Sequence, residues 1–151
     1  MNLNFRTKVA APLEQVKKGF DRSLFLRLKP PLILLVLERF DGCETGHEIH
    51  LRVGLPGALQ TWISKITSHK LERDSWSFVD EGSSLPFPLK NWRHHHSVKI
   101  LPSGGSEILD EITYSCGSRM LDLLLFGPLW FSFAGRASIY QRVFGRPKNS
   151  A

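Results

Sequence analysis

The stretch from residue 90 to residue 116 constrains the fold most strongly, because it holds two alternating segments joined by a short turn. In each segment the residues of one side are mostly apolar, which is typical of a β-strand with one face in the core. These inward residues are Trp92, His94, His96, Val98 and Ile100 in the first segment and Ile108, Asp110, Ile112 and Tyr114 in the second. Pro102-Ser103-Gly104 suits a three-residue hairpin loop. The two segments therefore predict an antiparallel hairpin.

The register of this hairpin follows from the two apolar faces. A slip of one residue would turn a whole strand over, so the pairing must keep both apolar faces inward. With the three-residue loop, His96 lies opposite Asp110 and His94 lies opposite Ile112. A buried, unpaired carboxylate is costly, and a charge-assisted hydrogen bond to an imidazole offsets that cost. We therefore expect His96 and Asp110 to pair, with His95 outward and solvated.

The remaining pattern predicts a sheet and helices around this hairpin. Expected strands cover residues 2–9, 32–40, 49–53, 58–68 and 71–80, and two short helices follow the first strand, before Pro30-Pro31. Gly127-Pro128 is expected to interrupt the C-terminal helical segment, which places the main helix from Pro128 to Phe144. The predicted fold class is α+β, in which a curved antiparallel sheet of about seven strands grips a long C-terminal helix.

Composition bounds the class of protein. With 151 residues, of which 42% are hydrophobic and 23% charged, residues 1–151 are expected to form a single globular domain. The net charge of +6 is dispersed and no nucleic-acid motif occurs, so we expect no nucleic-acid partner and at most peripheral contact with an anionic membrane surface. The first residues lack a secretory signal, which predicts a cytoplasmic protein with Cys43 and Cys116 reduced and buried.

Several short motifs resemble one known superfamily. They are Trp62-Ile63-Ser64-Lys65-Ile66, Phe78-Val79-Asp80-Glu81, Pro86-Phe87, Trp92-Arg93-His94-His95-His96 and the stretch from Ile108 to Tyr114. With the order of the predicted elements, they resemble the START-like, helix-grip superfamily, which includes polyketide cyclases and bacterial SRPBCC ligand-binding proteins. The resemblance covers nearly the whole chain. It implies a cavity between the sheet and the C-terminal helix for a lipid, polyketide or aromatic metabolite, and it leaves catalysis open.

Inward side chains of the predicted sheet and helix are the candidate ligand contacts. They are Trp62, Phe78, Trp92, His94, His96, Asp110, Ile112, Tyr114, Phe133 and Tyr140. The histidines can serve as hydrogen-bonded wall residues, as groups that orient a ligand, or as metal ligands. A zinc site needs a third ligand, for which only Asp110 is an obvious candidate, so neither a metal nor a cofactor is predicted.

Three functions remain open from the sequence. The first is a non-catalytic binder of a hydrophobic small molecule, which we favour. The second is a cyclase- or dehydratase-like enzyme in which His96 and Asp110 form the base, while His94 or Tyr114 polarises a carbonyl group. The third is a protein that binds a partner through Pro86-Phe87-Pro88 or through the apolar residues 121–131.

Overall fold

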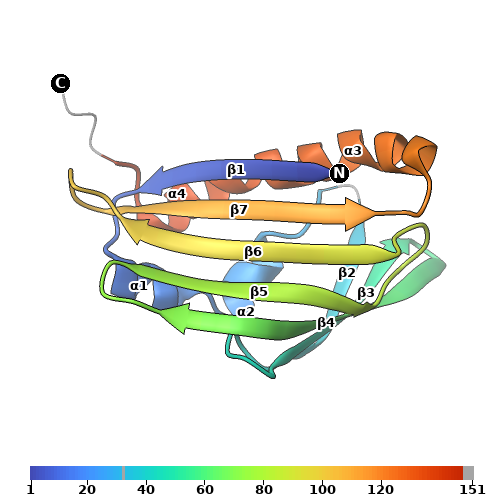
Figure 1. The fold of residues 1–151 in the computed structure, drawn as a ribbon, viewed down its shortest axis with the longest axis horizontal. Coiled ribbons are helices and arrows are strands. Elements are labelled where there is room, and N and C mark those ends of the chain that lie inside the picture. Colours follow the sequence, from blue (N-terminus) through green and yellow to red (C-terminus); the bar gives the residue numbers. More distant parts are fainter. Residues whose placement is uncertain (32, 148–151) are drawn as a thin grey trace.

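The computed structural model describes residues 1–31 and 33–147. Within this part of the chain, seven strands form one antiparallel sheet in the order β1-β7-β6-β5-β4-β3-β2 (Figure 1). The strands are β1 Asn2–Val9, β2 Leu34–Phe40, β3 Glu48–Leu55, β4 Ala58–Leu71, β5 Ser75–Ser84, β6 Asn91–Ile100 and β7 Ser106–Ser115. The helices are α1 Leu13–Gly19, α2 Arg22–Arg27, α3 Arg119–Ala134 and α4 Arg136–Phe144.

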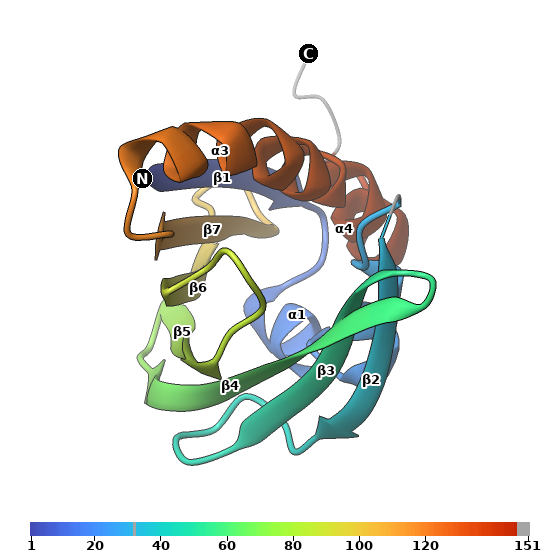
Figure 2. The same cartoon turned by 90° about the vertical axis from the view of Figure 1, so that its right-hand side faces the viewer.

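The sheet is strongly curved, and the helices lie on its concave side. In Figure 2 the sheet passes from β1 through β7, β6 and β5 to β4 and then curls round to β3 and β2. Helix α1 lies inside the curve, and α3 and α4 close its open side. The predicted α+β fold, with two short helices after the first strand and a C-terminal helix gripped by the sheet, is confirmed.

The predicted register of the β6–β7 hairpin is also confirmed. His96 pairs with Asp110, and His94 pairs with Ile112. The turn is closed by two hydrogen bonds, in which Leu101 N–H donates to the Gly105 carbonyl at 3.1 Å and Gly104 N–H donates to the Leu101 carbonyl at 3.0 Å. Both strands therefore place their apolar faces inward, as the alternation requires.

The expected helix break at Gly127-Pro128 is wrong. Helix α3 runs through Pro128, and the interruption falls at Gly135, between α3 and α4. Pro128 lacks an N–H and so leaves the carbonyl of Leu124 without its helical donor. Leu124 lies on the solvent side of α3, where water can hydrogen-bond to that carbonyl. The proline is therefore tolerated in this helix because it affects an exposed turn.

The end of α4 is hydrogen-bonded to the two residues that follow β1. The N–H groups of Ala10 and Ala11 donate to the carbonyls of Gly145 and Phe144 at 3.0 and 2.9 Å. Tyr140 and Phe144 are buried against the sheet, so α4 is held both by its side chains and by its last carbonyls. No helix of the described residues is long and apolar enough to cross a membrane.

The core consists of two hydrophobic clusters separated by polar side chains. One cluster packs α1, α2 and α4 on the middle of the sheet and includes Phe78, Val98 and Ile108. The other packs α3 on β1, β6 and β7 and includes Trp92 and Ile112. Along β6, His94 and His96 lie between Trp92 and Val98, and along β7, Asp110 lies between Ile108 and Ile112. A buried polar group therefore divides the core.

The hairpin turn offers a test of how closely it packs against the end of β1. Gly104 and Gly105 both have positive φ, 89° and 77°, but a Cβ at Gly105 would collide with the carbonyl oxygen of Val9, whereas a Cβ at Gly104 meets open space. We expect Gly104→Ala to lower the free energy of unfolding by about 1–2 kcal/mol, the cost of left-handed backbone for an L-residue. Gly105→Ala should lower it further, as urea denaturation would measure. Equal losses would contradict the close approach of Gly105 to Val9.

Candidate functional site

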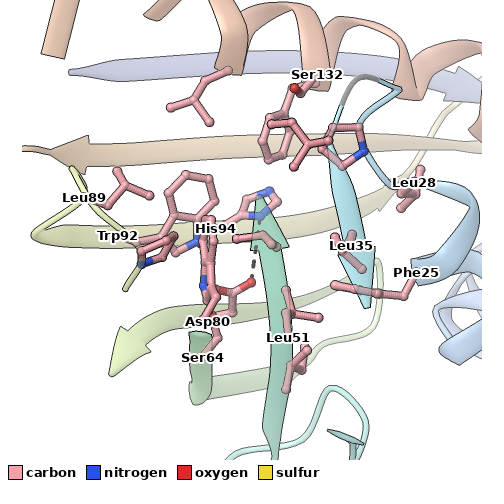
Figure 3. Close-up of a pocket in the computed structure, with 18 of the residues that line it drawn as sticks. Phe25, Leu28, Leu35, Leu51, Ser64, Asp80, Leu89, Trp92, His94 and Ser132 are labelled. Carbon is pink, nitrogen blue, oxygen red and sulfur yellow. Dashed lines mark hydrogen bonds and ion pairs between the residues drawn. The ribbon is translucent and has the colours of Figure 1, made fainter. Parts of the chain in front are cut away.

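A cavity of about 280 Å³ lies between the sheet and the helices. Its walls come from α2, from strands β2 to β6, from the loop before β6 and from α3 (Figure 3). Phe25, Leu28 and Leu35 lie on one side, Trp92 and Leu89 lie on the other, and Ser132 projects from α3. The lining is mainly apolar with a few polar side chains, which is the composition of most small-molecule pockets.

The polar part of the wall is built around the carboxylate of Asp110. Asp110 is only 2% exposed, and its Oδ1 accepts a hydrogen bond from Nε2 of His94 at 3.0 Å. The hydroxyl of Tyr140 donates to the same oxygen at 3.5 Å. Nδ1 of His96 lies 2.8 Å from it, but its orientation is too poor for a hydrogen bond, so this buried nitrogen has no partner among the described residues.

A second buried carboxylate, Asp80, faces the same histidines. Asp80 lies opposite His94 in the β5–β6 register. Its Oδ1 accepts a hydrogen bond from Nε1 of Trp92 at 3.1 Å, and its Oδ2 lies 3.9 Å from Nδ1 of His94. Figure 3 shows Ser64, Asp80, Trp92 and His94 gathered on this wall. Two carboxylates therefore flank His94, one on each side of its ring.

Burial controls the charge of these groups. It lowers the pKa of His94 to about 3, with His96 adding to the effect, despite the hydrogen bond to Asp110. Burial alone would raise the pKa of Asp110, but the hydrogen bond from His94 and the adjacent imidazole of His96 hold it well below its usual range. For Asp80, burial outweighs the opposing effect of His96 and the pKa is raised. His94 is therefore neutral near pH 7 and donates Nε2–H to ionised Asp110.

Two further titratable groups near the cavity stay protonated. Burial, with a smaller effect of Asp80, raises the pKa of the Cys43 thiol to about 12. Burial and Asp110 raise the pKa of Tyr140 well above its usual value. Cys43 and Cys116 are both free, and Cys116 is buried while Cys43 is partly buried. A protonated thiol is a poor nucleophile, so Cys43 acts as a small apolar part of the lining.

Arg136 adds a positive charge at the cavity. It is the first residue of α4, and its guanidinium lies 3.8 Å from the ring centroid of Phe133 in a cation–π contact. Its Nε is buried and has no hydrogen-bond partner among the described residues. Arg136 therefore brings an unused donor to the cavity wall.

Six of the ten ligand contacts predicted from the sequence line the cavity: Trp62, Phe78, Trp92, His94, His96 and Phe133. The other four lie behind the wall. Asp110 accepts a hydrogen bond from His94, Ile112 is buried beneath α3, and Tyr114 donates a hydrogen bond to the Asp122 carbonyl at 2.7 Å. Tyr140 is buried beside Asp110. The catalytic candidates His94, His96 and Asp110 are thus brought together, with His94 rather than His96 hydrogen-bonded to the carboxylate.

Asp80 and Arg136 are among the wall residues that were not predicted from the sequence. Asp80 shares the inward face of β5 with Trp76 and Phe78, so alternation within Phe78-Val79-Asp80-Glu81 could have placed it inward. Arg136 lies off the apolar stripe of a helix expected to start at Pro128. In the structure a new helix, α4, begins at Arg136 after Gly135. The sequence pattern did not predict this interruption between α3 and α4.

No protein-family model and no curated protein sequence matches this chain. Solved structures do match over most of its length. The crystal structure of protein Ms6760 from Mycobacterium smegmatis has 17% identity and a TM-score of 0.59, and covers 91% of this chain and 89% of its own. A protein from Arthrobacter aurescens has 18% identity and a TM-score of 0.63, with coverage of 99% and 89%.

Two further solved structures share this fold. Ara h 8.0201 has 13% identity and a TM-score of 0.52, and covers 91% of this chain and 97% of its own. The di-domain ARO/CYC StfQ from the steffimycin biosynthetic pathway has 17% identity and a TM-score of 0.55, with coverage of 95% and 47%. At these identities the likeness concerns the fold. Together with the curved sheet, the gripped helix and the cavity between them, these neighbours show that the chain has the helix-grip fold.

Proposed function

We propose that this protein binds a compact hydrophobic small molecule in the cavity between the sheet and α3. The observation that carries the proposal is a cavity of about 280 Å³ with a mainly apolar lining. An engineered apolar cavity of about 150 Å³ accepts benzene, so this space suits an apolar body near the size of two fused rings. That size favours an aromatic or polyketide-like metabolite, or one end of a lipid.

The polar groups of the wall suggest one further property of the ligand. The buried Nε of Arg136 lacks an acceptor among the described residues, and a buried donor without a partner costs about 1–3 kcal/mol. A carboxylate or carbonyl oxygen on the ligand would supply that acceptor. The proposed ligand is therefore an apolar body that carries an acceptor oxygen.

The protonation of the wall favours binding over catalysis. A general base works best when its pKa lies near the working pH. The pKa of His94 is about 3 and that of Cys43 about 12, so neither group exchanges protons readily near neutral pH. The cyclase- or dehydratase-like alternative needs His96 as the base, and the poor alignment of His96 with Asp110 gives it little support.

Filling the cavity should abolish binding. Ser132 projects from α3 towards the cavity, and Ser138 is exposed on α4. Each hydroxyl hydrogen-bonds to a carbonyl of the preceding turn. With 2-naphthol as the probe, we expect Ser132→Trp to weaken binding at least tenfold, about 1.4 kcal/mol, because the indole occupies the ligand's space. Ser138→Trp is the matched control and should bind like the wild type in a fluorescence titration. Unchanged affinity of a folded Ser132→Trp variant would argue against this cavity as the binding site.

The acceptor oxygen can be tested by comparing two probes. We expect 2-naphthoate to bind more tightly than naphthalene, and Arg136→Gln to remove about tenfold of that advantage, because a hydrogen bond to a charged group contributes about 1.5–3 kcal/mol. The affinity for naphthalene should not change. Arg142→Gln, which removes an exposed arginine of the same helix, should leave both affinities intact. An equal loss for both probes would mean that Arg136 supports the wall rather than the ligand.

We also propose peripheral contact with an anionic membrane surface through α3. The inner side of this helix is packed on the core by Leu121, Leu125, Leu129 and Phe133. Its outer side is also apolar, and Met120, Leu123, Leu124, Trp130 and Phe131 are exposed. Apolar patches on a surface mark interaction sites, and the net charge of +6 favours anionic lipids. Leu125 and Leu129 also line the cavity, so this contact would lie beside the ligand.

Replacing one outer residue of α3 should weaken this contact. Phe131 and Leu71 have nearly equal exposure, 53% and 52%, but lie on α3 and at the end of β4. We expect Phe131→Glu to reduce co-sedimentation with phosphatidylglycerol vesicles about tenfold, because burying an aromatic side chain contributes about 1.5–3 kcal/mol. Leu71→Glu makes the same change of charge and should have little effect. Equal losses would indicate a nonspecific charge effect, and a change of oligomeric state instead would point to self-association.

A further inference from the structure

Asp80, His94 and His96 form the one group of potential metal ligands that the described residues bring together. Their ligand atoms all lie within 4.8 Å of one another, and all three residues are buried. They come from adjacent strands, because Asp80 lies opposite His94 in the β5–β6 register and His96 is two residues further along β6. All three also line the cavity. The group therefore lies on rigid backbone with one side towards the ligand space.

Asp80 and His94 approach each other without a direct hydrogen bond among the described residues. Nε2 of His94 faces the ionised carboxylate of Asp110 at 3.0 Å, which only accepts hydrogen bonds, so Nε2 carries the proton. Nδ1 of neutral His94 then presents a lone pair to Oδ2 of Asp80, 3.9 Å away. A cation between these two atoms would be coordinated by both.

His94 has the support that metal-ligating histidines usually have. Such histidines commonly direct the second ring nitrogen to a carboxylate, which fixes the ring and makes the ligating nitrogen more basic. Here His94 donates Nε2–H to Oδ1 of Asp110, whereas Nδ1 of His96 lies 2.8 Å from the same oxygen without a hydrogen bond. Trp92 donates a hydrogen bond to the other oxygen of Asp80 at 3.1 Å. His94 and Asp80 are thus each oriented by a residue that lies behind them.

We propose that Asp80, His94 and His96 bind a divalent first-row transition-metal ion, with Asp110 and Trp92 as positioning residues. Two imidazoles and one carboxylate suit zinc, iron(II) or cobalt(II), whereas magnesium and calcium prefer oxygen ligands alone. Ligand bonds of about 2.0–2.2 Å would draw these atoms closer together. Three protein ligands leave coordination positions open, and these would face the cavity.

The charges of the cluster agree with this site. Asp80 and Asp110 are two buried carboxyl groups close to the imidazoles of His94 and His96, and Arg136 also borders the cavity. A divalent ion bound by Asp80 would favour the ionised form of its carboxylate.

Cobalt(II) gives a direct test on the full chain after treatment with a chelator. We expect one equivalent of cobalt to produce visible d–d absorption, and one equivalent of zinc to remove it. Asp80→Asn and His96→Gln should each lower the affinity for cobalt at least a hundredfold. Trp92→Phe should lower it about tenfold, in the range found for outer-shell partners. Circular dichroism identifies variants that fail to fold, and either ligand variant suffices if the other fails.

His95→Gln is the matched control. His95 is the neighbouring histidine of β6, but its ring pairs with Glu111 at 2.8 Å outside the cluster. Its replacement should leave the cobalt spectrum and affinity unchanged. No saturable absorption in the wild type would overturn the proposal and would indicate a shared proton or water between Asp80 and His94. Equal loss with His95→Gln would also overturn it, since binding would then be at surface histidines.

This site does not depend on the proposed ligand. Binding of 2-naphthol to the metal-free protein is measured separately. If cobalt binds and 2-naphthol does not, the metal site stands and the proposed function fails; the opposite result rejects the metal site alone.

Discussion

The buried carboxylate of Asp110 is the constraint on which the rest of the wall depends. At 2% exposure it needs donors on every side, and removing one partner of a buried charged pair costs about 3–5 kcal/mol. His94 and Tyr140 supply those donors from β6 and α4. A one-residue slip of β7 would bury Glu111 and remove Asp110 from them. The carboxylate therefore ties the hairpin register to the position of the last helix.

The same polar group explains why the two hydrophobic clusters stay separate. Side chains of both clusters line the cavity, among them Phe78 and Leu51 from one and Trp92 and Phe133 from the other. Asp80, His94 and His96 lie between them and face the same space. Apolar side chains from the two sides cannot close over these polar atoms without leaving them unpaired. A cavity at this place is consistent with that restriction.

The sequence predicted those features that depend on local alternation. The β6–β7 register followed from two apolar faces and a short loop, and the histidines and Asp110 were placed with it. Alternation could have placed Asp80 inward, but its pairing with His94 depends on the loop of residues 85–90, whose length does not determine a register. The predicted helix break at Pro128 was wrong because the cost of a proline inside a helix depends on whether the carbonyl that loses its donor, here that of Leu124, meets solvent. Such features depend on tertiary surroundings, which periodicity does not report.

Helix α3 links the cavity to the surface. Its inner residues Leu125 and Leu129 line the cavity, while Leu124, on the outer side, is exposed. Burial of the outer side of α3 in a lipid surface would be favourable whether or not its inner side stays packed on the sheet. If α3 moved away from the sheet, lipid would also bury its inner apolar side chains. Contact with a membrane would therefore lower the cost of moving α3 away from the sheet. Since α4 is held by Ala10 and Ala11, such a movement would bend at Gly135, so membrane contact and access to the cavity would be coupled through one helix.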